Sequence, residues 1–346
     1  MPRASILSEV LRRRFDPAFE ALMRRMSRYD VRGPLRAALA PHRSRAMRRT
    51  IERFEPEVTP LEGAVLRGEA SAIERFDTLV AEAVAAMRAE RPDEPDGDRL
   101  EALLHAVDAP LYRDRPELMD DPSCPEDERT HALDVLDRFN HCTGLYDTVM
   151  AAIDPLVEAA AKGEEKRPIV HDVAAGHGGL ALYLAERYGD RVAIEASDLR
   201  EEYLALGRAQ AAERGLSVAF SVEDALALGG LEARGVDVIT CTQALHHFPP
   251  GMIARMMSEA ARRARVGACF VDGERSYTTL GLVALVGALY GRTYTFYYDA
   301  VTSIRRMFYE EELALVAALA PGMPAVRVET GIAKPSHVYV RILREA

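Results

Sequence analysis

From residue 168 onward the sequence alternates between short apolar runs and amphipathic runs, and this alternation constrains the fold most strongly. Strands are expected at "PIVHDVA", "RVAIEASD", "SVAFSVED", "VDVITCTQA" and "ACFVDGE", with helices between them at "GLALYLAERYG", "REEYLALGRAQAAERGL" and "GMIARMMSEAARRARVG". Strands joined by helices at this spacing form a parallel sheet covered on both faces. The tail, residues 325–343, holds two strand-like runs joined at Lys334-Pro335, which predicts an antiparallel hairpin at the sheet edge.

The part of the chain before this alternation reads as helical. Residues 72–90 place apolar side chains at three- and four-residue spacing. Proline-marked polar segments follow at 91–98 and 114–128. We therefore expect an all-helical domain at 1–127, acting as a cap or a dimerisation unit, and an α/β domain at 128–346. The second domain begins with a helical lead-in at 128–163, interrupted near Gly144.

Charge and cysteine content narrow the setting of the protein. The net charge is −10, yet residues 1–60 hold 14 Arg against 7 Asp plus Glu. We interpret these arginines as a solvated helical face, because no aromatic interleaving or recognition motif supports nucleic-acid binding. The four cysteines form no C-x-x-C pair, which favours a reduced, cytoplasmic setting. No secretory signal is expected, and the longest apolar stretch, 279–292, is too short to span a bilayer.

Small residues crowd the turn after the first strand, in "IVHDVAAGHGGL" at 169–180. Gly176, Gly178 and Gly179 let backbone approach a ligand, or serve only the turn itself. The third glycine of a dinucleotide G-x-G-x-x-G motif is missing. Asp172 at the strand end is a poor neighbour for a pyrophosphate and a good one for an ammonium or sulfonium group. The stretch therefore favours S-adenosylmethionine over a nicotinamide dinucleotide.

Two further aspartates end the next two strands. Asp198 lies 20 residues after Gly178, where a carboxylate accepts hydrogen bonds from ribose hydroxyls. Asp224 follows the third strand and could accept a hydrogen bond from an adenine amino group. Each aspartate alone fits a helix cap or a turn equally well. Three acidic strand ends in succession favour a shared ligand site.

Together, "HDVAAGHGG", "EASDLR", "VEDALAL", "VDVITCTQALHHF" and "RRARVGACFVDGE" resemble class I (Rossmann-like) S-adenosylmethionine-dependent methyltransferases over roughly residues 130–346. The resemblance is to small-molecule members related to quinone and polyketide methyltransferases. It implies that Asp172 and the glycine loop hold the methionine part, Asp198 the ribose, and Asp224 with Ala225 the adenine. The full cofactor-binding set that it implies is Asp172, Ala174, Ala175, Gly176, Gly178, Asp198, Leu199, Glu223, Asp224, Ala225 and Thr242. Two departures are Ala174, where the family usually has glycine, and Val266-Gly267-Ala268 in place of Pro-Gly-Gly.

Methyl transfer to an oxygen benefits from a base, because a phenol has a pKa near 10. His246 and His247 follow the fourth strand, and one of them, with His247 preferred, is the expected base. The alternative is that the pair packs and caps the loop. No metal site is expected, because adjacent histidines on a loop converge poorly on one ion and no third ligand is evident.

Further side chains are expected near the ligands. Asn140, His141, Tyr277 and Arg305 are the candidates for acceptor binding, and His177 would flank the methionine carboxylate. Local packing is the alternative for Asn140, His141 and His177. A helix core, a dimer face or a solvated helix face is the alternative for the others.

Three hypotheses for the function follow. The first is a small-molecule methyltransferase of secondary-metabolite biosynthesis, producing S-adenosylhomocysteine. Its acceptor would be a hydroxylated aromatic or polyketide-like compound, covered by the apolar, tyrosine-rich segment 276–300. The second is a protein or peptide methyltransferase that docks an acidic partner on the Arg-rich segment. The third is a non-catalytic scaffold. A homodimer through the N-terminal helices is also expected.

Overall fold

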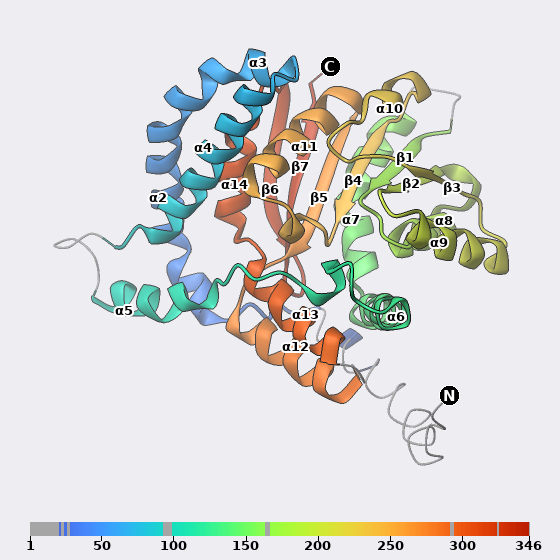
Figure 1. Ribbon diagram of the computed structural model, residues 1–346, viewed down its shortest axis with the longest axis horizontal. Helices are drawn as coiled ribbons and strands as arrows, with labels where there is room; N and C mark the ends of the chain where they lie inside the picture. Colours follow the sequence, from blue (N-terminus) through green and yellow to red (C-terminus); the bar gives the residue numbers. More distant parts are fainter. Residues whose placement is uncertain are drawn as a thin grey trace.

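A seven-stranded sheet forms the centre of the molecule (Figure 1). The computed structural model describes residues 21, 24–25, 28–92, 99–162, 167–290, 294–323 and 325–345. The strand order is β3-β2-β1-β4-β5-β7-β6, that of the class I methyltransferase sheet. The strands are β1 (Ile169–Val173), β2 (Ala193–Asp198), β3 (Val218–Val222), β4 (Val238–Thr242), β5 (Gly267–Gly273), β6 (Val326–Ala333) and β7 (His337–Arg344).

The direction of the strands follows from how they are connected. Strands β1 to β5 are parallel, and helices join them. Every residue of β5 is buried, as expected for a parallel strand covered on both faces. Strand β7 runs antiparallel to β5 and to β6, with the cis Lys334–Pro335 bond in the intervening turn. All five predicted strands and the C-terminal hairpin are confirmed.

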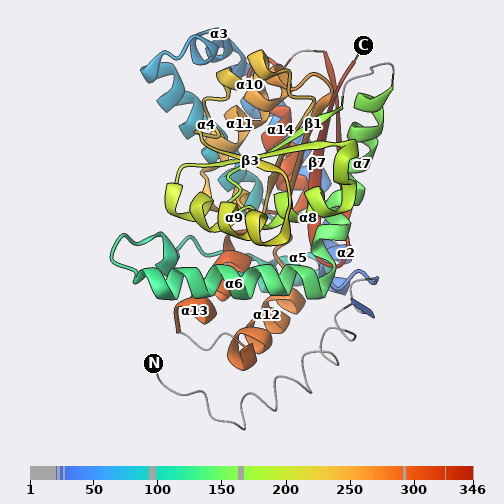
Figure 2. The ribbon, with the colours of Figure 1, turned by 90° about the vertical axis from the view of Figure 1, so that its right-hand side faces the viewer.

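Helices cover both faces of the sheet. Helices α7 and α8 share a core with β1 and β2, and α9 packs beside α8. Helices α11 and α14 pack on the other face; Figure 2 shows α7 on one side of the sheet and α11 on the other. The helices of this part are α7 (Leu145–Ala161), α8 (Gly179–Tyr188), α9 (Glu201–Arg214), α10 (Gly229–Arg234), α11 (Pro250–Arg263) and α14 (Glu310–Ala318).

The N-terminal helices pack against α11 and α14 rather than forming a separate body. Phe54, Phe76 and Leu79 belong to the same hydrophobic core as Ile253 and Leu313. The sequence boundary near residue 127 therefore does not separate two cores. These helices are α2 (Pro34–Val58), α3 (Glu62–Leu66), α4 (Ala70–Ala89) and α5 (Arg99–Asp108). Residues 1–20 and most of the proline-marked break at 91–98 lie outside the described residues.

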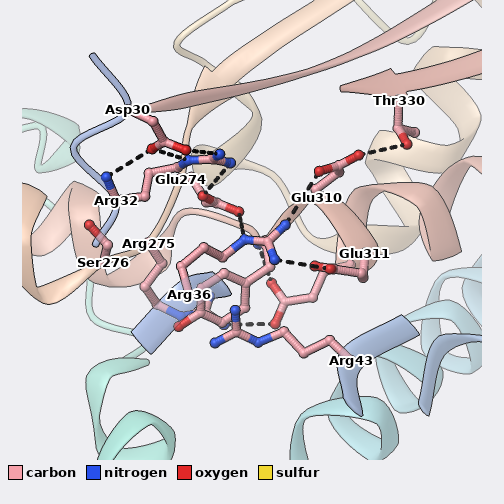
Figure 3. Close-up of polar contacts among 12 residues, drawn as sticks. Asp30, Arg32, Arg36, Arg43, Glu274, Arg275, Ser276, Glu310, Glu311 and Thr330 are labelled. Atoms are coloured by element: carbon pink, nitrogen blue, oxygen red, sulfur yellow. Dashed lines mark hydrogen bonds and ion pairs between the residues drawn. The ribbon is translucent and has the colours of Figure 1, made fainter. Parts of the chain in front are cut away.

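Several N-terminal arginines are buried in ion pairs, which makes the expected solvated face wrong for them. Arg36 Nε lies 2.6 Å from Glu274 Oε1, and Arg36 Nη1 lies 3.1 Å from Glu311 Oε1 (Figure 3). Arg32 Nη1 lies 2.9 Å from the other Glu274 oxygen. Arg32 and Arg36 are 4% and 7% exposed. These contacts tie the start of α2 to the end of β5.

A cap lies across the carboxyl ends of the central strands. It consists of α6 (Glu126–Thr143), the short 3-10 helix η3 (Leu118–Asp120), α12 (Tyr277–Tyr290) and α13 (Tyr294–Arg306). Figure 1 shows α6, α12 and α13 together below the sheet. Gly144, which has a φ of 69°, lies between α6 and α7 and caps both, at the interruption that the sequence predicts. Within the described part of the chain, no helix combines the length and apolar character that crossing a membrane requires.

Candidate functional site

A cavity of about 380 Å³ lies between the strand ends and the cap. Its position is the crevice at the carboxyl ends of the strands, where open parallel sheets bind ligands. The strand side and the cap side of the wall differ in polarity. Polar and glycine-turn residues line the strand side: Asp172, Ala174, Ala175, Gly176, His177, Asp198 and Thr242. Mostly apolar residues line the cap side: Leu133, Leu136, Phe139, Leu282, Val283, Phe296, Ile304 and Met307. The cap side also carries three carboxylates, those of Glu117, Asp120 and Asp299.

The turn between β1 and α8 brings backbone to the edge of the cavity. Gly176 and Gly178 have φ values of 57° and 78°, in the left-handed region that glycine tolerates best. A Cβ on Gly178 would lie 2.6 Å from the Phe220 ring, so no larger residue fits there. Ala174 has a φ of 51° in the same turn. Ala174 therefore has the backbone geometry that glycine favours, at a position where the family that the sequence resembles usually has glycine.

Two carboxylates face the cavity from the ends of β1 and β2: Asp172, which is buried, and Asp198, which is partly buried. Burial raises the pKa of Asp172 to about 7; a hydrogen bond from Thr240 opposes this rise and the charge of Asp198 adds to it. Burial also raises the pKa of Asp198, although backbone N–H groups partly offset the rise. Asp198 accepts from the N–H of Gly176 at 2.8 Å and of Arg200 at 2.9 Å. A cationic ligand would stabilise both carboxylates in their charged form.

Three buried polar atoms on the cavity wall have no hydrogen-bond partner among the described residues. They are Asn140 Oδ1, His177 Nε2 and Thr242 Oγ1. Buried polar groups are ordinarily hydrogen-bonded, so unpaired ones from three separate elements fit a polar ligand in the cavity. The Asn140 amide is held in place because its Nδ2 donates to Gln243 Oε1 at 2.8 Å. Gln243 itself has a φ of 54°, which is sparsely populated backbone beside the site.

Both histidines of the "HHF" run line the cavity, and a carboxylate holds each imidazole. His246 Nδ1 lies 2.9 Å from Asp272 Oδ2, and the same oxygen accepts from the His246 backbone N–H at 2.9 Å. His247 Nδ1 lies 3.3 Å from Asp120 Oδ2. Burial alone would lower the pKa of His247, but the hydrogen bond to Asp120 and the charge of Glu117 raise it to about 9. His246 is 6% exposed, and its Asp272 partner is fully buried.

Glu117 stands beside both histidines, which corrects the expectation that no third ligand lies near them. One ligand atom from each of Glu117, His246 and His247 lies within 4.8 Å of the other two. Glu117 comes from the proline-marked segment before α6. Asp299 of α13 accepts from the N–H groups of Leu118 and Met119, at 2.6 and 2.9 Å, and holds that segment over the cavity. Burial raises the pKa of Asp299 to about 6.

Three residues expected to bind the acceptor are not on the cavity wall. Tyr277 donates its hydroxyl to the Val107 carbonyl at 2.7 Å and is 43% exposed. Arg305 donates to the carbonyls of Leu111 and Pro110, at 3.1 and 3.2 Å. His141 bonds the Asp137 carbonyl at 3.0 Å and packs its ring edge-on to Tyr146. Tyr277 and Arg305 instead join the cap to residues 107–111, and His141 packs where α6 meets α7.

Five of the expected cofactor contacts also lie off the cavity wall: Gly178, Leu199, Glu223, Asp224 and Ala225. They lie in the glycine turn and after β2 and β3, and the Glu223 N–H donates to the Asp198 carbonyl at 3.3 Å. Asp224 accepts from the Leu226 N–H at 2.9 Å, as a turn residue would. Their contact with a cofactor stays a prediction.

Four carboxylates of the site were missed by the sequence reasoning: Glu117, Asp120, Asp272 and Asp299. Asp272 carried a usable signal, because it lies near the carboxyl end of the fifth parallel strand, as Asp172 and Asp198 do on theirs. Glu117 and Asp120 carried none, because only tertiary contacts bring their segment over the sheet.

Comparison with known proteins agrees with this geometry. Residues 170–267, less than a third of the chain, match the family described as "Methyltransferase domain". No curated protein matches the sequence. The chain therefore contains a methyltransferase domain, and the cavity lies at its strand ends.

Similar solved structures are remote in sequence. Magnesium protoporphyrin IX methyltransferase from Synechocystis PCC 6803, with bound S-adenosylhomocysteine, is 19% identical, covers 60% of this chain and 86% of its own, and has a TM-score of 0.41. The plantazolicin methyltransferase BpumL with S-adenosylhomocysteine is 11% identical, with coverages of 66% and 92% and a TM-score of 0.48. An S-adenosylmethionine-dependent methyltransferase from Aquifex aeolicus is 17% identical, with coverages of 57% and 93% and a TM-score of 0.38. At these values the similarity extends to the fold and no further.

Proposed function

We propose that this methyltransferase transfers the methyl group of S-adenosylmethionine to a small, largely hydrophobic acceptor, most simply to a hydroxyl on an aromatic or polyketide-like compound. The observation that carries the proposal is the division of one cavity into a polar half at the strand ends, with Asp172 and Asp198, and a largely apolar half under the cap. The polar half fits the cofactor and the apolar half fits the acceptor.

The charge of the polar half supports this cofactor. Asp172 is buried and has no ion pair among the described residues, so it favours a cationic ligand. A pyrophosphate would meet two carboxylates at the same place. Asn140, His177 and Thr242 offer polar atoms for its hydrogen-bonding groups. S-adenosylmethionine supplies a methyl group already activated by a sulfonium sulfur.

The size and enclosure of the cavity support a small acceptor. A cavity of about 380 Å³ falls within the range typical of small-molecule sites. Phe139 of α6 and Phe296 of α13 place aromatic rings on the acceptor side. The cap aligns the acceptor and excludes water, which an in-line displacement requires. The acceptor hydroxyl loses its proton, its oxygen bonds the methyl carbon, and the carbon–sulfur bond breaks with its electron pair on sulfur.

The histidine pair supplies the proton acceptor in this proposal. His246 has the better geometry, because two Asp272 oxygens lie 2.9 and 3.1 Å from its Nδ1 and Nε2 is left for the acceptor. His247 is held only by Asp120, which is half-exposed and 3.3 Å away. This reverses the preference for His247 that the sequence suggested.

Two alternatives are less well supported. A protein or peptide methyltransferase would dock its partner on N-terminal arginines, but Arg32, Arg36, Arg43, Arg45 and Arg49 pair with carboxylates of this chain. A non-catalytic scaffold has no need for buried unpaired polar atoms around a cavity. A homodimer through the N-terminal helices stays a prediction.

The proposal is tested by incubating the protein with methyl-labelled S-adenosylmethionine and a panel of phenolic and polyketide acceptors. We expect label in at least one organic product. His246→Asn should lower turnover by about 100-fold or more with unchanged cofactor affinity, since general base catalysis contributes about 10²–10⁴-fold. His105→Asn, remote from the cavity, is the matched control. Transfer to proteins but to no small molecule would overturn the proposed acceptor class.

A further inference from the structure

Glu117, His246 and His247 lie close together on the cavity wall, at distances longer than a hydrogen bond. His246 Nε2 lies 3.7 Å from Glu117 Oε1, and His247 Nε2 lies 3.9 Å from Glu117 Oε2. Both separations are too long for hydrogen bonds. Around a tetrahedral ion with bonds of about 2.1 Å, neighbouring ligand atoms are about 3.4 Å apart. The two imidazoles approach different oxygens of Glu117, and one ligand atom from each residue lies within 4.8 Å of the other two. The three side chains therefore need to close up by at most about 1.4 Å to hold one tetrahedral ion.

The surroundings of the three side chains orient them as ligands. Each histidine has its Nδ1 held by a carboxylate, at 2.9 Å by Asp272 and at 3.3 Å by Asp120. That arrangement fixes the ring and leaves Nε2 for an ion, as is usual for metal-bound histidines. Ser303 Oγ donates to Glu117 Oε1 at 2.7 Å and fixes the third ligand.

The local charge also favours a cation. The carboxylates of Asp120, Asp272 and Asp299 lie around Glu117, His246 and His247. Arg306 approaches Glu117 only to 3.9 Å, and its Nε lies 3.6 Å from Asp114. Among the described residues, the two imidazoles and the more distant Arg306 therefore face these carboxylates as basic groups.

We infer that Glu117, His246 and His247 bind a divalent metal ion at the acceptor end of the cavity. Two imidazole nitrogens and one carboxylate oxygen suit Zn²⁺, Mn²⁺, Fe²⁺, Co²⁺ or Ni²⁺, whereas Mg²⁺ and Ca²⁺ prefer oxygen ligands alone. Three protein ligands leave a coordination position open, and all three residues line the cavity. The role of the ion rests on the proposed function. When bound, the ion would coordinate the acceptor oxygen at the open position and lower the pKa of its hydroxyl, so that the proton is lost to water. His246 and His247 would then act as ligands and not as the base.

The full-length protein, stripped of metal with a chelator, is titrated at pH 8 with Zn²⁺ by calorimetry and with Co²⁺ by visible absorption. We expect one equivalent of each to bind, with Co²⁺ bands typical of mixed nitrogen and oxygen ligands. Glu117→Gln and His247→Gln should each weaken binding by at least ten-fold. Asp114→Asn, which removes a carboxylate three residues away, should leave the affinity unchanged. Circular dichroism shows whether each variant is folded.

A titration of the metal-free protein with S-adenosylmethionine separates this inference from the proposed function. Cofactor binding without stoichiometric metal binding would overturn the metal site and leave the function standing. Metal binding that both variants leave unchanged would also overturn it, because the ion would lie elsewhere. One equivalent of metal lost in both variants, with no cofactor binding, would support the site and contradict the proposed function.

Discussion

Ala174 has a backbone conformation that glycine normally adopts. It has a φ of 51° in the turn that carries Gly176 and Gly178. A side chain in the left-handed region costs about 1–2 kcal/mol. The turn therefore holds strain at the edge of the cofactor half of the cavity.

Replacing this alanine tests the strain directly. Ala174→Gly should raise the free energy of unfolding by roughly 0.5–1 kcal/mol, because relief of strain exceeds the extra chain entropy of glycine. Ala175→Gly is the control, since Ala175 has no positive φ, and it should lower stability by about 0.5–1 kcal/mol. Both are measured by denaturant unfolding. Equal losses of stability in the two variants would show that the backbone at 174 is unstrained.

Asp172 makes cofactor binding depend on pH. Its pKa of about 7 is raised by burial, and a cationic ligand binds the ionised form. Binding is therefore fully favoured above pH 7 and weakens as the pH falls below it, by up to about ten-fold per pH unit.

Calorimetric affinities for S-adenosylmethionine between pH 5.5 and 8 measure this dependence. Asp172→Asn should bind weakly at every pH, with only the dependence that the cofactor's own amino group brings. The same steep dependence in wild type and variant would assign the titration to another group.

At the scale of elements, the crossing of α4 and α11 fixes how the N-terminal helices sit on the sheet. A Cβ on Gly251 would lie 2.3 Å from the Cα of Asp77, so the two backbones are in close contact. Arg255 and Asp77 form a two-pronged ion pair beside it, at 2.9 and 2.8 Å.

Gly251→Ala should lower the free energy of unfolding by about 1–3 kcal/mol, as overpacking does. Gly281→Ala in α12 is the matched control, because open space surrounds that position. A helix-interior glycine exchanged for alanine in open space should gain about 0.5–1 kcal/mol. Thermal unfolding followed by circular dichroism measures both. A neutral Gly251→Ala would mean that α4 does not pack on α11 in solution.

Elements with strong local patterns were predictable. The strands, the helices between them, the interruption at Gly144 and the C-terminal hairpin all follow from periodicity and turn residues. Proline and acidic residues dominate residues 114–128, a pattern that predicts only a polar break near the domain boundary. They cross the cavity because Asp299 and Ser303 of α13 bind their backbone and Glu117. These contacts join residues far apart in the sequence, so no local pattern predicts them.

At the scale of the molecule, a buried ion-pair network joins the N-terminal region to the central sheet. Glu274 is fully buried and contacts Arg36 at 2.6 Å and Arg32 at 2.9 Å (Figure 3). Asp272, which holds His246, lies two residues earlier. Arg32 and Arg36, which we expected on a solvated face, thus connect distant parts of the fold. Counting charges along the chain does not reveal such contacts.

Glu274→Gln should lower the free energy of unfolding by about 3 kcal/mol, because it leaves two buried guanidinium groups short of a charged partner. Glu310→Gln is the control, since Glu310 is more exposed and 3.3 Å from Arg36, and it should cost less than about 1 kcal/mol. Denaturant unfolding compares the two variants. Similar small losses would show that the network adds little to the joining of the two regions.

The central claim is that the polar half of the cavity binds S-adenosylmethionine, and calorimetric titration tests it most directly. We expect one equivalent of S-adenosylmethionine and of S-adenosylhomocysteine to bind in the micromolar range, and NADH not to bind. Asp198→Ala should weaken cofactor binding by more than ten-fold, since a charged hydrogen-bond partner contributes about 1.5–3 kcal/mol. Binding of NADH would contradict the account. So would a folded protein that binds neither S-adenosylmethionine nor S-adenosylhomocysteine.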